Sequence, residues 1–316
     1  MSRERERRGR NGIPSWTTIG TESERLPRMS TIRYEAPTTL DQAVRLCSAD
    51  PNASLLAGGT DLLVQFRAGG TQPSAYIDLK LIPDLTGITV DGSGLRLGAA
   101  TPAWDICQHQ EVARLWPGFV DAVGLIGSAQ IQGRATVGGN LCNASPAADT
   151  TAALIVNRGQ CVIVGPDGQR TVTVEEFCTG PGLTVLRPGE LLVAVRLQQP
   201  APRTADAYLR LIPRSEMDIA VAGAAVSLTL DAKGVCSAAR VAIAAVAPKA
   251  LLVPAAAEAL VGSPVNESAL ERAAAAASAA ARPIDDKRGT VAYRRTVVGV
   301  LTRRAATIAA TRAKDH

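Results

Sequence analysis

The chain has 316 residues, of which 46% are hydrophobic, 20% charged and only 3% aromatic. Its net charge is +5, and most of that excess lies in residues 1–28, where seven arginines oppose four glutamates. The near-neutral remainder and the scarcity of aromatic rings argue against a nucleic-acid-binding surface, and the absence of a run of 18 apolar residues excludes a transmembrane helix.

Residues that could bind a metal ion or catalyse a reaction directly are sparse. The two histidines, His109 and His316, are too few for a histidine triad or a multi-histidine metal site. The six cysteines contain no C-x-x-C spacing, so neither a zinc site nor an iron–sulfur site is expected. We therefore predict no metal site and no catalytic side chain, and we expect a bound cofactor to carry any chemistry. No secretory segment is visible, which predicts a cytoplasmic protein with reduced thiols.

The first half of the chain predicts alternating short strands and helices. Residues 1–28 are charged and aperiodic, which predicts a disordered tail, with the ordered chain beginning at about Met29. Thr39 and Gln42 fit a capping box at the start of a helix. The expected elements that follow are a strand over 54–57, a helix over 62–67, a strand over 75–79, a hairpin over 88–97, and a helix opening at Thr101-Pro102.

The second half changes character near residue 200. Before that point we expect a strand over 135–137, a helix from Ser145-Pro146 to about 157, paired strands over 161–164 and 170–174, and a strand over 191–197. Residues 198–202 are typical of a linker. Two alternating strands, 219–230 and 235–246, and three alanine-rich helices follow, which predicts a separate α+β domain.

Gly58-Gly59 forms the first motif that could bind a ligand, since a predicted strand precedes it and a predicted helix follows. Glycine permits positive φ and close approach of the backbone to a ligand. Free amides in such a turn, together with the helix N-terminus, form a site for an anion such as a diphosphate. Taken alone, the pair could equally be a structural strand-to-helix turn.

Gly138-Gly139 forms the second motif, and it again follows a predicted strand. Asn140 offers both a donor and an acceptor, and Asp149 can accept from a ribose hydroxyl. Ser145 could instead serve only as a helix cap, and Asn143 could only close the loop. Neither motif fits G-x-G-x-x-G or the P-loop pattern. Two glycine pairs about eighty residues apart predict one phosphate-rich ligand held from both sides.

The residues around these motifs resemble the flavoprotein subunit of the xanthine dehydrogenase and carbon monoxide dehydrogenase family. The resemblance covers about residues 30–312 and rests on many patterns in order. They are Leu55–Leu63, Gly133–Asn140, Ser145–Asp149, Gly180–Gly182, Pro188–Leu192, Arg210, Arg214, Met217–Ala220, Asp285–Arg288 and Tyr293–Arg295.

The resemblance implies an α+β fold in two domains. The first would be a two-lobed FAD-binding domain of the vanillyl-alcohol oxidase (PCMH) type over residues 29–200, with lobes at about 29–85 and 86–200. The second would be a C-terminal flavoprotein domain over residues 205–313.

The resemblance also implies which residues hold the FAD. The diphosphate would be bound mainly through backbone amides, Asp149 would bind a hydroxyl, Leu62, Ile126 and Val193 would lie near the flavin or adenine, and Arg210 would lie near the cofactor. The full implied set is Ala57, Gly58, Gly59, Thr60, Asp61, Leu62, Ile126, Thr136, Val137, Gly138, Gly139, Asn140, Asp149, Val193 and Arg210. No obvious histidine is present for covalent attachment, so we expect noncovalent FAD.

By the same resemblance, this chain transfers electrons within a molybdenum hydroxylase. A large partner would hold molybdopterin, a small partner would hold [2Fe–2S] clusters, and the complex would be a dimer of heterotrimers. The flavin would deliver electrons to NAD, a quinone or another acceptor. The substrate stays open among carbon monoxide, purines, aldehydes and N-heterocycles. Two alternatives are a self-contained flavin oxidoreductase on the same fold and a non-catalytic nucleotide-binding protein.

Overall fold

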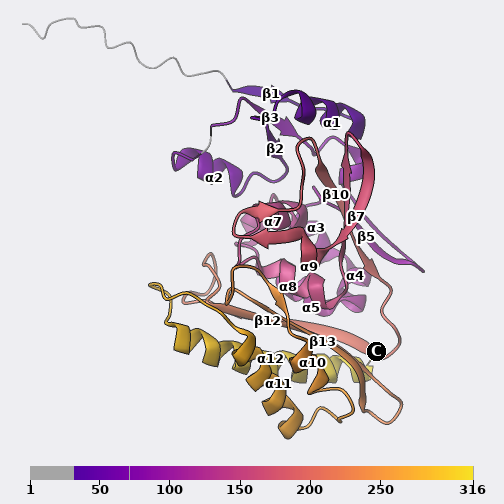
Figure 1. Ribbon diagram of the computed structural model, residues 1–316. Helices are drawn as coiled ribbons and strands as arrows, with labels where there is room; N and C mark the ends of the chain where they lie inside the picture. Colours follow the sequence, from indigo (N-terminus) through magenta and orange to yellow (C-terminus); the bar gives the residue numbers. More distant parts are fainter. Residues whose placement is uncertain (1–31, 71, 316) are drawn as a thin grey trace, which may run out of the picture. The chain divides into compact units, whose positions relative to one another are not determined.

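A small parallel sheet begins the folded chain in the computed structural model, which describes residues 32–315 except Thr71. The predicted tail over residues 1–28 lies outside the described residues. The sheet has the strand order β1-β3-β2, and α1 and α2 belong to the same segment (Figure 1). Its elements are β1 (Arg33–Glu35), α1 (Leu40–Ala49), β2 (Ser54–Leu56), α2 (Leu62–Arg67), β3 (Ala75–Asp78) and the 3₁₀ helix η1 (Pro83–Leu85).

The start of α1 confirms the predicted cap with one change. The hydroxyl of Thr39 accepts a hydrogen bond from the backbone of Gln42, as a cap residue should. The side chain of Gln42, however, accepts from the backbone N–H of Thr38 and not from that of Thr39. The reciprocal half of the capping box is therefore displaced by one residue.

A five-stranded antiparallel sheet with the order β4-β5-β10-β6-β7 forms the second part of the chain. Helices α3 to α8 occur between its second and third strands in the sequence, β5 and β6. The strands and the short elements after them are β4 (Ile88–Asp91), β5 (Gly94–Gly98), β6 (Gln160–Gly165), β7 (Gly168–Thr173), α9 (Val174–Phe177), β8 (Cys178–Gly180), β9 (Leu183–Thr184) and β10 (Leu191–Gln198). The helices are α3 (Ala103–Gln108), α4 (Gln110–Leu115), α5 (Pro117–Gly124), α6 (Ala129–Gln132), α7 (Val137–Asn143) and α8 (Asp149–Val156).

The C-terminal part is a four-stranded antiparallel sheet, β11-β12-β13-β14, with helices on both faces. Helix α12 contacts β11 and β12, whereas α5 and α8 contact the same sheet from the preceding part of the chain (Figure 1). The elements are β11 (Thr204–Leu211), β12 (Ala222–Leu230), β13 (Cys236–Ala244), β14 (Leu251–Leu252), α10 (Pro254–Glu258), α11 (Glu267–Ala280) and α12 (Val291–Asp315). In the part of the chain that the structure describes, no helix is long and apolar enough to cross a membrane.

One sequence prediction is wrong about the type of element, and another is wrong about where a helix begins. Residues 135–137 are not a strand, because Thr136 caps α7, which begins at Val137. The helix expected from Ser145-Pro146 begins only at Asp149, and the Ser145 hydroxyl accepts from the nearby N–H of Ala147. Strand β11 was not predicted, although polar and apolar residues alternate along Thr204–Leu211 as in a strand.

The two expected domains share apolar packing. One buried cluster combines Leu97, Trp116 and Leu154 with Tyr208 and Ala225 of the C-terminal sheet. A second cluster lies between the C-terminal sheet and its helices and includes many alanines, which allow close packing. The described residues form one compact unit. The expected boundaries at 29–200 and 205–313, with lobes at about 29–85 and 86–200, stay a proposal.

Gly118 and Asp206 join these two regions by a buried hydrogen bond. The backbone N–H of Gly118, in α5, donates to the buried Asp206 carboxylate of β11 over 2.7 Å. The side chain of Asn157 donates to the other carboxylate oxygen over 2.6 Å. Arg312, near the end of α12, donates to Asp121 over 2.7 Å and to the Asp206 carbonyl over 2.9 Å. Backbone, carboxylate and guanidinium groups thus connect α5, β11 and α12.

Gly118→Ala should destabilise the fold, because an added Cβ would lie 2.4 Å from the Ala207 nitrogen and 2.6 Å from its Cα. We expect the free energy of unfolding to fall by about 1–3 kcal/mol, the usual cost of overpacking. The control is Gly92→Ala, where an added Cβ meets nothing within 4 Å and the change should stay within about 0.5 kcal/mol. Urea unfolding that gives equal losses for both variants would show that α5 and β11 are not in close contact.

Asp206 should make the protein less stable as the pH rises from about 4 to about 6. Burial raises the pKa of this carboxyl from 3.8 to about 6, and the negative charge of Asp121 raises it further. The hydrogen bonds from Asn157 and Gly118 and the positive charge of Arg312 lower the pKa but do not offset burial. The folded chain therefore keeps a proton that the unfolded chain loses, so stability is lost as pH rises through this window. Asp206→Asn should flatten this part of the pH profile. An unchanged slope in chemical denaturation would contradict the assignment.

Candidate cofactor site

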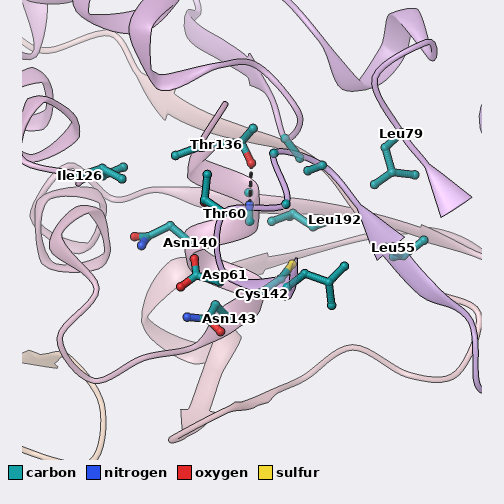
Figure 2. A pocket seen from close by; sticks show the side chains of 18 of the residues that line it. Leu55, Thr60, Asp61, Leu79, Ile126, Thr136, Asn140, Cys142, Asn143 and Leu192 are labelled. Atoms are coloured by element: carbon teal, nitrogen blue, oxygen red, sulfur yellow. Dashed lines mark hydrogen bonds between the residues drawn. The ribbon is translucent and has the colours of Figure 1, made fainter. Parts of the chain in front are cut away.

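A cavity of about 270 Å³ lies between the turn before α2 and the start of α7. Figure 2 shows the side chains around it, including Thr60 and Asp61 from the first segment and Asn140 and Asn143 from the second. The cavity thus brings together two motifs that are far apart in the sequence. Its lining residues are Leu55, Ala57, Gly58, Gly59, Thr60, Asp61, Leu62, Gln65, Leu79, Ala99, Ile126, Ala135, Thr136, Gly138, Gly139, Asn140, Cys142, Asn143, Leu186 and Leu192.

The first wall is the turn between β2 and α2, and it presents unused backbone donors. Gly59 has φ +77°, which a residue with a side chain rarely adopts. Among the described residues, the backbone N–H groups of residues 58–61 donate no hydrogen bond. Asp61 precedes α2 but its side chain makes no capping hydrogen bond. Four consecutive free amides beside a helix start are the arrangement expected of an anion-binding turn, and that role stays a prediction.

The second wall, the start of α7, differs from the prediction because most of its amides are already used. Thr136 accepts from the N–H of Gly139 over 2.9 Å with its hydroxyl, and from the N–H of Asn140 over 3.0 Å with its carbonyl. The N–H of Gly138 donates to the carbonyl of Ala99 over 3.2 Å. This wall therefore offers side chains to a ligand more than it offers backbone amides.

The first glycine of each pair allows close packing of the backbone, and Gly58 does so between the two walls. An added Cβ at Gly58 would lie 1.9 Å from the carbonyl oxygen of Arg134, just before the second wall. At Gly138 it would lie 2.3 Å from the carbonyl oxygen of Ala99. At Gly139, in contrast, the Thr136 hydroxyl at 3.0 Å is the only atom within 4 Å among the described residues, apart from the chain neighbours and the helix's own backbone. Gly58 and Gly138 are thus required by packing within the protein, whereas Gly139 faces more open space.

Lys80 supports the first wall from behind. Its Nζ donates to the carbonyl of Ala57 over 3.1 Å and to Asp78 over 2.6 Å. Tyr34 also donates to Asp78. Although burial opposes ionisation, the hydrogen bonds from Lys80 and Tyr34 lower the pKa of the Asp78 carboxyl below its ordinary value. The ionised Asp78 holds the Lys80 ammonium, and a positive charge therefore lies beside the turn that presents the free amides.

Four of the predicted site residues do not line the cavity. Val137, the first residue of α7, is buried. Val193 is buried too, and its neighbour Leu192 lines the cavity instead. Asp149 and Arg210 bind one another over 2.5 Å, and Tyr208 donates to Asp149 over 3.0 Å. Burial is the main cause that raises the pKa of Tyr208 well above its ordinary value, so the phenol stays a neutral donor.

Sequence reasoning missed several lining residues. Gln65 donates to the side chain of Asn143 over 2.9 Å, which joins α2 to α7 beside the cavity. Gln65 lies one turn beyond Leu62 on the same helix, and this spacing could have identified it. Cys142 and Leu186 had no comparable signal. The cavity also has an apolar part next to its free amides, which is lined by Leu55, Leu79, Ile126, Leu186 and Leu192.

The family follows from comparison with known proteins. Residues 29–200 match the family described as the FAD binding domain in molybdopterin dehydrogenase. Residues 207–309 match the CO dehydrogenase flavoprotein C-terminal domain. The first match covers more than half of the chain. The protein therefore belongs to the FAD-binding flavoprotein family of the molybdopterin dehydrogenases, and the resemblance noted in its sequence is confirmed.

The relatives include subunits of two kinds of dehydrogenase. The carbon monoxide dehydrogenase medium chain of Hydrogenophaga pseudoflava is 34% identical over 86% of this chain and 94% of its own length. The xanthine dehydrogenase FAD-binding subunit of Escherichia coli O157:H7 is 34% identical over 75% of this chain and 82% of its own length. The chain is thus a flavoprotein subunit of an oxidoreductase of the carbon monoxide and xanthine dehydrogenase type.

Solved structures confirm the fold. A chain of the reconstituted CO dehydrogenase from Oligotropha carboxidovorans has a TM-score of 0.86 and 32% identity, covering 89% of this chain and 98% of that one. A chain of quinoline 2-oxidoreductase from Pseudomonas putida 86 has a TM-score of 0.83 and 28% identity, with the same coverage. The expected α+β fold, an FAD-binding domain followed by a C-terminal flavoprotein domain, is therefore confirmed.

The residues present fit FAD. Adjacent free amides suit a diphosphate, and the nearby Lys80 ammonium adds a favourable charge. The apolar side chains on the same cavity suit a flat aromatic ring. Polar side chains at Asp61, Asn140 and Asn143 can bind hydroxyl and carbonyl groups.

Gly58→Ala should weaken FAD binding by separating the two walls. The added Cβ would displace the Arg134 carbonyl, so we expect Kd for FAD to rise by about tenfold or more, on the order of 1.4 kcal/mol. The matched control is Gly133→Ala, next to the same carbonyl, where the nearest atom would lie 3.7 Å away. Fluorescence titration of the FAD-free chain measures both. Unchanged affinity in Gly58→Ala would contradict the role of this contact.

Proposed function

We propose that the chain is the electron-transfer subunit of a heterotrimeric molybdenum hydroxylase and that the described cavity holds noncovalent FAD. One observation carries the proposal: four consecutive unbonded amides open onto a cavity with an apolar part. A diphosphate and a flavin ring together need this combination. Residues 58–61 would bind the diphosphate, Ile126 and Leu192 would contact a ring, and Asp61 and Asn140 would bind polar groups of the cofactor.

Among the residues first expected to touch FAD, six have a different proposed role. Asp149 and Arg210 neutralise one another and would support the second wall, not the cofactor itself. Val193 would support the sheet beneath Leu192. Thr136, Gly138 and Gly139 would shape the wall that carries Asn140, since their amides are largely bonded within the protein.

FAD can accept electrons singly and release them in pairs, which suits a carrier between an iron–sulfur donor and a two-electron acceptor. We propose that a small partner with [2Fe–2S] clusters supplies the electrons and that a large molybdopterin partner oxidises the substrate. The acceptor would be NAD, a quinone or another oxidant. The name "medium chain" of the carbon monoxide dehydrogenase relatives supports such an assembly. A dimer of heterotrimers in the cytoplasm stays part of this proposal.

The chain's own residues would bind and orient the cofactor without reacting with a substrate. Within the described residues, no group of three or more histidine, cysteine or acidic side chains is placed to hold a metal ion. Burial raises the pKa of the Cys178 thiol to about 11 and that of the Cys236 thiol above its ordinary value, so both are poor nucleophiles near neutral pH. The substrate would therefore be selected by the partner that oxidises it.

The purified chain should release FAD, about one per chain, into the supernatant after acid precipitation. Its flavin should be bleached by dithionite, but no carbon monoxide, purine, aldehyde or N-heterocycle should be turned over. Co-expression with the small and large partners should yield one complex in size-exclusion chromatography, and substrate should then reduce an acceptor dye.

Two results would overturn this proposal in different ways. A folded chain without affinity for FAD would refute the cofactor assignment. Substrate oxidation by the single chain with only FAD present would support a self-contained flavin oxidoreductase instead of an electron-transfer subunit.

A further inference from the structure

The side chain of Asn140 is held in one orientation by a buried hydroxyl. Thr150, which is fully buried in α8, donates its hydroxyl proton to Oδ1 of Asn140 over 2.6 Å. The backbone N–H of Asn140 is bonded to the Thr136 carbonyl, which fixes the start of the side chain as well. Its amide nitrogen, Nδ2, has no hydrogen-bond acceptor among the described residues, although Asn140 lines the cavity.

This geometry determines which end of the amide is free. Oδ1 and Nδ2 have similar shapes, so an unrestrained asparagine can present either an acceptor or a donor to a ligand. In the structure the Thr150 hydroxyl donates to Oδ1, so the oxygen end of the amide faces Thr150. The end left for the cavity is then the NH₂ group, which can donate to an anionic oxygen but cannot accept from a hydroxyl.

The helix that carries Thr150 is anchored by the C-terminal sheet. Asp149, the neighbouring residue, binds Arg210 over 2.5 Å and Tyr208 over 3.0 Å, and both partners lie on β11. The side chains of this ion pair are almost completely buried. A second contact joins the N–H of Ala245, just after β13, to the carbonyl of Pro146 over 2.8 Å. The segment before α8 is therefore fixed at two points by the C-terminal sheet.

We propose that Thr150 is a positioning residue for the cofactor. Its hydroxyl turns the Nδ2 atom of Asn140 toward the cavity as a donor to a phosphate oxygen of FAD. The C-terminal sheet supports this arrangement, because Tyr208 and Arg210 of β11 hold Asp149, the neighbour of Thr150. Through this contact the sheet influences the FAD site, although Tyr208 and Arg210 do not touch the cofactor. The inference rests on the proposed function, since it assumes that FAD occupies this cavity.

The experiment removes the hydroxyl while keeping the shape. FAD is removed from the full-length chain, and its rebinding is followed by flavin fluorescence in Thr150→Val and in Thr150→Ser. Valine leaves the Asn140 amide free to rotate, so we expect Kd to rise about tenfold, whereas serine should keep it within about twofold of the wild type. If valine prevents folding, Thr150→Ala removes the same hydroxyl with a smaller side chain.

A double-mutant cycle separates positioning from a purely structural role. Asn140→Ala removes the donor, so adding Thr150→Val to it should cause no further loss of FAD affinity. A purely structural role would give the same additional loss in both backgrounds, and that result would overturn the inference. Equal affinity of wild type and Thr150→Val would overturn it too, with the proposed function intact. Failure of the wild-type chain to bind FAD would overturn both.

Discussion

The close approach of two backbone segments is the constraint on which the site depends. Gly58 lies against the carbonyl of Arg134 in a space where no side chain could fit, and Gly138 lies similarly against the carbonyl of Ala99. The first contact brings the turn after β2 to the start of α7, the second packs α7 against the residue after β5, and a cavity is left between the two walls. The glycines therefore serve the ligand indirectly, because they let the protein pack against itself. The free amides of residues 58–61 can then face the cavity, since the turn has no other partner there.

The two walls have complementary chemistry. The first presents backbone N–H groups, with Lys80 bonded to the carbonyl of Ala57 behind it. In the second, the Thr136 cap satisfies the amides internally, and Asn140 is left to contact a ligand. The C-terminal sheet supports this second wall through the buried pair of Asp149 and Arg210. A domain that does not line the cavity thus contributes to its geometry, which gives a physical reason for both domains to occur in one chain.

Much of the first wall could be predicted from sequence, and less of the second. A strand, a glycine pair and a helix follow one another directly around Gly59, so local rules were sufficient, and the observed positive φ of Gly59 agrees with them. Around Thr136 the apolar residues suggested a strand, but the threonine caps a helix. Asp149 and Arg210 were expected near the cofactor from the resemblance, but their binding to one another could not be predicted, because sequence shows which residues are polar and not which partners they find. The two residues are about sixty positions apart in the chain, and only the fold brings them together.

Amide hydrogen exchange, measured residue by residue with and without FAD, tests the central claim most directly. The N–H groups of residues 58–61 donate no hydrogen bond among the described residues. They should therefore exchange fast in the FAD-free chain and become protected when FAD binds. The N–H of Gly139 is already bonded to Thr136 and should change much less. If FAD binds while residues 58–61 still exchange at the rate of the free chain, the diphosphate is held elsewhere and this account of the site is wrong.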